Sequence, residues 1–181
     1  GQSPSAEFDA AVADIDKAIQ IDNRHADALF ARGTVAVFKA DAKIIKGEDP
    51  TADLVTATAD LSASFDLNPK AAVLAQRGLG WLKLAEHQRV MGQPIDDALG
   101  KAEADLSDAI KRDGRQAAAL LHRGAVHAMR ALVRAARVED AAASIAAAAQ
   151  DAAAALKMRP GWAEALVVKG QAQLAAADAL R

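Results

Sequence analysis

Histidines and carboxylates are the residues of this sequence that could do chemistry. The sequence has no cysteine, which excludes a thiolate nucleophile and thiolate metal sites. A zinc-binding histidine pair on one helix needs a spacing of four residues. His122 and His127 are five residues apart and would point about 140° away from each other. No glycine-rich phosphate loop or nucleophile elbow is present. The sequence therefore predicts a non-enzymatic protein with no catalytic residue, no metal site and no cofactor.

A basic residue and an acidic residue recur at matched positions. The basic positions are Arg32, Arg77, Arg123 and Lys169, and the acidic positions are Asp14, Asp60, Asp105 and Asp151. This one-to-one matching favours a ladder of ion pairs between neighbouring helical hairpins, in which Asp105 would contact Arg123. A stripe that binds a ligand is the alternative. If the pairs are partly buried, removing one partner strands the other charge.

Each basic residue belongs to a longer motif, Leu-x-x-Arg/Lys-Gly, that marks a repeat. The glycines of the four copies are Gly33, Gly78, Gly124 and Gly170, at intervals of 45, 46 and 46 residues. Such a period indicates units that stack on their neighbours. Glycine inside a helix costs about 0.5–1 kcal/mol relative to alanine. The motif therefore predicts that helices cross closely at these glycines.

The elements that hold these motifs are expected to be helices. Alanine, the best helix former, is abundant, and the β-branched runs typical of strands are missing. Apolar residues recur at helical spacing between breaks rich in Gly, Pro and Asn. We therefore expect an all-α chain of about eight helices over residues 5–22, 28–47, 52–66, 71–91, 95–111, 116–137, 140–158 and 162–181.

The run from Ala11 to Asp22, followed by Ala28-Leu29 and Gly33, resembles a tetratricopeptide repeat (TPR). It matches the second helix of one repeat and the first helix of the next. The resemblance implies a right-handed α-solenoid of antiparallel helical hairpins, in a single domain over residues 1–181. The sequence starts on a second helix of a hairpin and ends on a first helix, which suggests a piece excised from a longer chain. We divide it into a half-repeat over 5–22, repeats over 24–67, 69–112 and 115–159, and a terminal helix over 161–181.

The repeat is longer than the roughly 34 residues of the family. Gly47 and Gly92 follow the glycines of their motifs by 14 residues, which gives the first helix of each hairpin about two extra turns. The remainder lengthens the second helix by about one turn. The single 45-residue interval is assigned to a shorter turn at Asn68-Pro69.

In this family the first helices line a concave surface that binds peptides or partner helices. The basic and asparagine clamp that some members use for a C-terminal carboxylate is absent here, because those positions are mostly apolar. This favours an apolar or helical ligand. Whether the side chains line an open groove or fill a tighter superhelix stays open. The transferred positions are Phe30, Thr34, Val37, Phe38, Ala75, Leu79, Leu82, Lys83, Leu121, Ala125, Ala128, Met129, Val167, Gln171 and Leu174.

Composition narrows the class of partner. The net charge of −2 and the dispersed basic residues argue against nucleic acid, and no apolar run reaches the roughly 18–20 residues that span a membrane. The leading hypothesis is a protein–protein interaction scaffold that binds a peptide or partner helix. One alternative is a self-association module acting through the terminal helices. Another is an accessory region of a larger enzyme, such as a bacterial signalling kinase. The compartment is not determined, with the cytoplasm slightly favoured.

Overall fold

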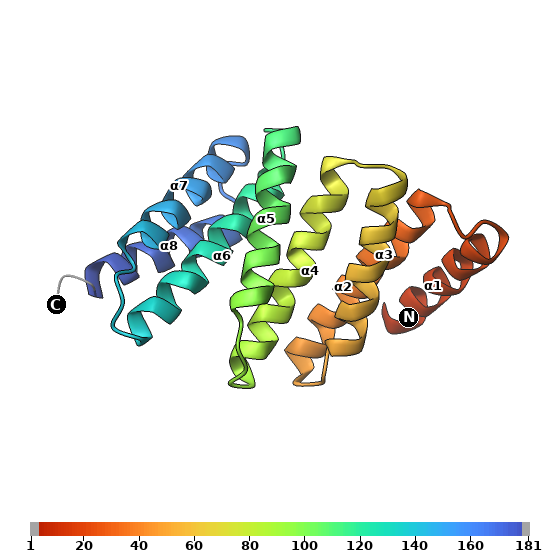
Figure 1. Cartoon of the computed structure of the whole chain (residues 1–181), viewed down its shortest axis with the longest axis horizontal. Coiled ribbons are helices and arrows are strands. Elements are labelled where there is room, and N and C mark those ends of the chain that lie inside the picture. The colour runs from red at the N-terminus through yellow and green to blue at the C-terminus, as the bar shows by residue number, and fades with distance from the viewer. Residues whose placement is uncertain (1–3, 179–181) are drawn as a thin grey trace.

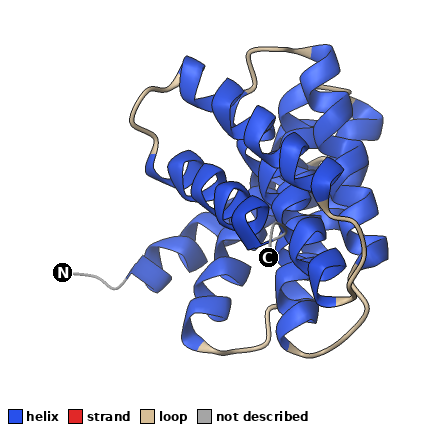
Figure 2. Ribbon diagram, turned by 90° about the vertical axis from the view of Figure 1, so that its left-hand side faces the viewer, coloured by secondary structure: helices blue, strands red, loops and turns tan. Residues whose placement is uncertain are grey.

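The computed structural model describes residues 4–178, with side chains from 10 to 177. Within this range the chain forms eight helices and no strand (Figure 2), which confirms the all-α prediction. The last three residues of the predicted terminal helix lie outside the described residues. The helices are α1 (Pro4–Ile21), α2 (Ala26–Lys46), α3 (Thr51–Leu67), α4 (Ala71–Val90), α5 (Asp96–Arg112), α6 (Ala117–Ala136), α7 (Ala142–Met158) and α8 (Ala163–Asp178).

The helix lengths follow the repeat. We call the helices that carry the Arg/Lys-Gly motif first-type helices (α2, α4, α6 and α8) and the others second-type helices. The first-type helices α2, α4 and α6 have 20 or 21 residues. The second-type helices α3, α5 and α7 have 17 each. The connection between α3 and α4 spans residues 68–70, whereas the corresponding turns span 113–116 and 159–162. The shorter 45-residue interval therefore does arise at Asn68-Pro69.

Positive backbone φ angles mark the turns after the long helices. Gly47 ends α2 in the left-handed region at φ 73° and donates its N–H to the carbonyl of Ile44. Gly92 has φ 67° after α4. The same place after α6 is taken by Val138 at φ 58°, a conformation that a β-branched residue rarely adopts. The third hairpin therefore keeps the geometry of its turn without the glycine.

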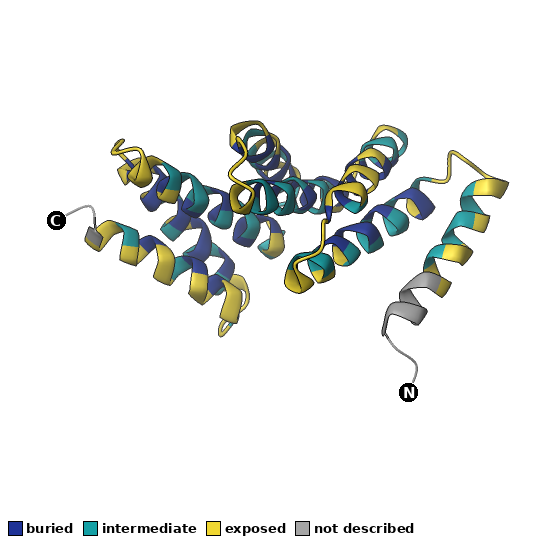
Figure 3. Cartoon of the chain, turned by 90° about the horizontal axis from the view of Figure 1, so that it is seen from below, coloured by how far each residue is buried: buried dark blue, intermediate teal, exposed yellow. Residues whose placement is uncertain are grey.

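The helices follow one another as antiparallel hairpins, with α1 at one end of the array and α7 and α8 at the other (Figure 1). Each first-type helix contacts the next: α2 contacts α4, α4 contacts α6, and α6 contacts α8. Across the described residues, α3, α5 and α7 make no such contacts with one another. The first-type helices therefore lie closer together and line the inner side of an arched array (Figure 3).

Close helix crossings at the glycines organise the core. A Cβ atom at Gly33 would lie 2.7 Å from Cγ of Leu61, and one at Gly78 would lie 2.6 Å from Cγ of Leu106. At Gly124 the nearest atoms would be 3.3 Å away. The predicted close crossing is confirmed at these three glycines. It is wrong for Gly170, where no atom lies within 4 Å, because no second-type helix follows α8 in the described residues.

The predicted ion pairs form, but with different partners from those expected. The Arg77 guanidinium holds Asp105 through two hydrogen bonds, Nε to Oδ2 and Nη2 to Oδ1, both 2.7 Å. The same bidentate pairing joins Arg32 to Asp60 and Arg123 to Asp151. Each pair thus lies within one hairpin. The expected contact of Asp105 with Arg123 is wrong.

The remaining nitrogen of each guanidinium reaches the preceding hairpin. Nη1 of Arg77 donates to Oγ of Ser62 at 3.0 Å, and Nη1 of Arg123 donates to Oγ of Ser107 at 3.2 Å. In the first copy, Nη1 of Arg32 donates to Asp16 in α1 at 2.8 Å. Each arginine therefore ties together three helices, and the expected bridge between neighbouring hairpins exists through this third contact.

Candidate partner-binding groove

The inner side of the array holds a hollow of about 740 Å³. Its walls come from the C-terminal parts of α2 and α4, the middle of α6 and one residue of α8. The loop after α2 also lines the hollow, through Gly47, Glu48 and Asp49. The apolar lining residues are Ile44, Val90, Met91, Ala125, Ala128, Met129 and Leu132.

Several of these apolar side chains are open to solvent. Val90 is 74% exposed and Leu132 is 52% exposed. They come from different helices but line the same hollow. Apolar side chains that gather in one concave surface commonly mark a place where another molecule binds. The hollow is therefore the best candidate for a binding site.

Acidic residues outnumber basic ones in the lining of the hollow, with Glu48, Asp49 and Glu86 against Arg89 and His87. Nε2 of His87 lies 3.5 Å from Oδ1 of Asp49, and the pKa of Asp49 is lowered by hydrogen bonds from the side chain and the backbone of Thr51. Nζ of Lys83 lies 2.7 Å from Asp41 and 3.2 Å from Glu86. Acidic groups thus lie beside His87 and Lys83, whereas Arg89 is exposed and has no ion pair among the described residues. The lining as a whole carries more acidic than basic side chains.

Only some of the site residues predicted from the sequence line the hollow. Ala125, Met129 and Gln171 line the hollow. Val37, Leu82 and Leu121 are buried in the core, so of the two alternatives these side chains fill the interior and do not line an open groove. They face the packed interior because the glycine crossings bring the helices too close together to leave these positions open.

The other predicted residues lie outside the hollow. Phe30 and Leu79 pack against the core of the first hairpin, and Phe30 also lines a small separate cavity with Val73. Thr34 is partly buried, and Lys83 is held by its two acidic partners. Phe38 is largely exposed but does not line the hollow.

Sequence reasoning missed Ile44, Val90, Met91 and Leu132. All lie in or just after the last two turns of α2, α4 or α6, the turns by which these helices exceed the family repeat. The family's groove positions do not extend that far. The available signal was the continuation of apolar residues to the end of each long helix, at Ile44-Ile45, Val90-Met91 and Leu132-Val133.

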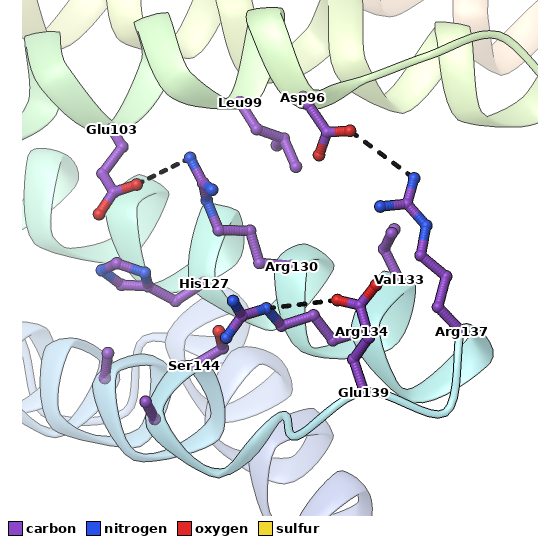
Figure 4. Close-up of a pocket in the computed structure, with 12 residues that line it drawn as sticks. Asp96, Leu99, Glu103, His127, Arg130, Val133, Arg134, Arg137, Glu139 and Ser144 are labelled. Atoms are coloured by element: carbon purple, nitrogen blue, oxygen red, sulfur yellow. Dashed lines mark ion pairs between the residues drawn. The ribbon is translucent and has the colours of Figure 1, made fainter.

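A second cleft of about 500 Å³ lies between α5, α6 and α7 (Figure 4). It is crossed by ion pairs of Arg130 with Glu103 at 2.9 Å, Arg137 with Asp96 at 3.6 Å and Arg134 with Glu139 at 3.9 Å. His127 also lines this cleft, and burial lowers its pKa. Because the charges neutralise one another, the cleft has a structural explanation as a set of bridges between helices.

Among the described residues, no group of three or more His, Cys, Asp or Glu side chains could hold a metal ion. No described helix is long and apolar enough to cross a membrane.

The arrangement defines the class as a helical-repeat α-solenoid. The Arabidopsis OM64 TPR domain matches with a TM-score of 0.51 and 21% identity, over 81% of this chain and 98% of that one. The first TPR of Spaghetti (RPAP3), bound to the HSP90 peptide SRMEEVD, matches with a TM-score of 0.53 and 18% identity, over 81% and 96%. No protein-family model and no curated protein matches the sequence. The chain has the tetratricopeptide-repeat fold, with hairpins elongated to a 45–46-residue period.

Proposed function

We propose that this chain is a protein-interaction module that binds an apolar peptide segment or partner helix in the groove at the ends of α2, α4 and α6. The observation that carries the proposal is the set of solvent-open apolar side chains in one hollow, including Val90, Met91 and Leu132. The fold supports it, because a domain of the same architecture is bound to a peptide. The volume lies within the roughly 300–1,000 Å³ of ligand sites, enough for a few side chains of a partner.

The chemistry of the groove favours a ligand without a cluster of acids. The peptide on the Spaghetti domain ends in two glutamates, a valine and an aspartate. Here the rim carries three acids, Glu48, Asp49 and Glu86, against one arginine, Arg89, and His87 is already close to Asp49. A peptide of the SRMEEVD kind would meet like charge. We therefore expect the ligand to be an apolar stripe with neutral or basic flanks.

Binding of selected peptides tests this proposal. Peptides from a random library are enriched on the immobilised chain, and one of them is labelled for fluorescence anisotropy. We expect Leu132→Glu to weaken binding about tenfold or more, because a charge would enter the apolar contact. Val55→Glu is the matched control, because Val55 is also exposed but lies on α3, away from the groove.

Equal binding by wild type and Leu132→Glu would overturn the groove assignment. Enrichment of acidic peptides that compete with SRMEEVD would contradict the proposed ligand chemistry. An accessory role in a larger enzyme remains a prediction from the sequence and is compatible with the same groove.

A further inference from the structure

The outer face of α8 exposes positions that are buried on the other first-type helices. Leu174 lies four residues after Gly170 and is 65% exposed, whereas Leu82 lies four residues after Gly78 and is 2% exposed. Leu166, four residues before Gly170, is likewise exposed, whereas Leu74 is buried. In α4 these positions belong to the core cluster that includes Leu99 and Leu106 of α5. We call the contact between a first-type helix and the second-type helix that follows it a junction. The α8 face thus resembles the α4 side of the α4–α5 junction, but no helix covers it in the described residues.

The charged position on this face is also without a partner. Lys169 stands where Arg32, Arg77 and Arg123 each hold an aspartate of the following helix. The described part of the chain gives Lys169 no ion-pair partner. Gly170 beside it has no atom within 4 Å of a Cβ position, so the space that Leu61 and Leu106 occupy elsewhere is open.

The opposite end of the array presents the matching half. The described side chains of α1 repeat the pattern of α3, with Ala11, Asp14 and Ile15 corresponding to Ala57, Asp60 and Leu61. The Asp14 side chain is 79% exposed, whereas that of Asp60 is 9% exposed. Ala11 is exposed, whereas Ala57 is fully buried. Asp14 pairs with Lys17 of its own helix, 2.9 Å away.

A different part of α1 holds it to the array. Asp16 accepts a hydrogen bond from Arg32 at 2.8 Å, which is the place of Ser62 and Ser107 in the later repeats. The Asp14 side chain remains outside this contact. The α1 and α8 faces lie at opposite ends of the long axis (Figure 1), so each end is accessible to a separate molecule.

We propose that α1 of one copy docks on α8 of a second copy, head to tail. In the register of the three internal junctions, Asp14 pairs with Lys169 and Ile15 covers Gly170. A second copy fits because each chain carries both halves of a junction that its own fold repeats three times, with opposite charges at the matching positions. The contact is heterologous, so it joins copies head to tail, into a closed ring if the rotation between copies closes and into an open filament if it does not. It also continues the inner surface from one copy to the next.

Mass measurement across a concentration series tests the proposal, by light scattering on the whole chain. We expect the average mass of wild type to rise with concentration. Lys169→Glu and Asp14→Lys should each weaken association about tenfold or more, because like charges then meet. An equimolar mixture of these two variants should regain association, since each junction in the mixture joins opposite charges.

Gly170→Leu provides a steric version of the same test. The open space at Gly170 and the better helix propensity of leucine keep the single copy folded, which circular dichroism verifies. The added side chain would block Ile15 of the second copy, so association should be lost. Val55→Glu, on the surface of α3, is the matched control and should associate as wild type does.

Three outcomes would overturn the proposal. Wild type could remain a monomer at every concentration. It could associate equally well in all variants, which would place the contact on another surface. Or Lys169→Glu could dissociate it while Asp14→Lys does not, which would mean that α8 pairs with α8 or with a different segment. Because none of these changes touches the peptide groove, peptide binding can fail independently of association.

Discussion

The three internal junctions and the two end faces are built from the same residue types, but the structure places them in opposite environments. At the α4–α5 junction, Arg77 holds Asp105 with two hydrogen bonds, and Gly78 leaves room only for Leu106. On the end faces, Lys169 has no ion-pair partner in the described residues, and Asp14 pairs only locally with Lys17.

The comparison shows that a repeated motif stabilises the fold only where a neighbouring helix completes it. Within each internal hairpin the motif forms packing and bidentate hydrogen bonds with low exposure, which are the stronger kind of polar contact. At the ends the same motif is a surface. The same substitution at equivalent positions of a junction and an end face should therefore change the free energy of unfolding by different amounts, and in one case with opposite sign.

The largest difference is expected for the aspartates. Asp105→Ala should lower the free energy of unfolding by about 3–5 kcal/mol, because it strands the largely buried charge of Arg77. Asp14→Ala should leave the unfolding free energy unchanged, because its pair is exposed to water. Urea unfolding of both variants measures the comparison.

A double-mutant cycle supplies the control for the aspartates. Arg77 and Asp105 should show a coupling energy, whereas Arg123 and Asp105, which do not pair, should be closer to additive. Equal losses of stability from Asp105→Ala and Asp14→Ala would contradict the comparison.

The next effect concerns pH and His122, a partly buried residue of α6. Burial, with a smaller contribution from the charge of Lys83, lowers the pKa of His122 from 6.5 to about 4. As the pH falls from 6.5 to about 4, the unfolded chain takes up a proton that the folded chain excludes. His122 therefore removes at most about 3 kcal/mol of stability in this window and none above it.

His122→Gln should reduce this loss of stability at acid pH. Urea unfolding along a pH series measures the effect, and neutral to alkaline pH serves as the internal control, because His122 is uncharged there in both states. The same acid slope in His122→Gln and wild type would show that His122 is hydrated and outside the closed interior.

The smallest effects are expected at the glycines, with opposite signs. Gly78→Ala should lower the unfolding free energy by about 1–3 kcal/mol, because its Cβ would overlap Leu106. Gly170→Ala should raise it by about 0.5–1 kcal/mol, because the helix gains propensity and nothing is displaced. Thermal unfolding of dilute protein measures both changes. A loss of stability in both variants would mean that the α8 face is covered in the single copy.

Much of the architecture could be predicted because it depends on local signals. The helices end near glycines, prolines and asparagines, and the 45-residue interval pointed to the short turn at Asn68-Pro69. The matched Arg and Asp positions predicted that ion pairs exist. The matched positions could not show that Asp105 pairs with Arg77. Since both residues recur once in every repeat, an aspartate could pair equally well with the arginine of the preceding helix or of the following helix.

The candidate site was harder to predict. Ala125, Met129 and Gln171 could be placed from the family's groove positions. Val37, Leu82 and Leu121 carry the same kind of side chain at related positions, yet they are buried. Exposure at these positions depends on how closely successive helices cross. Ile44, Val90 and Leu132 were missed because they belong to turns that the family repeat lacks.

The sequence by itself determined the helices, their lengths, their repeat and the residue types that recur at each junction, because capping, periodicity and side-chain size act over a few turns. Only the tertiary structure decided which aspartate each arginine holds, which groove positions are covered and which junction residues remain exposed. These outcomes depend on the distance and the angle between helices far apart in the chain. Close packing sets both through the combined fit of many side chains, and no single motif specifies them.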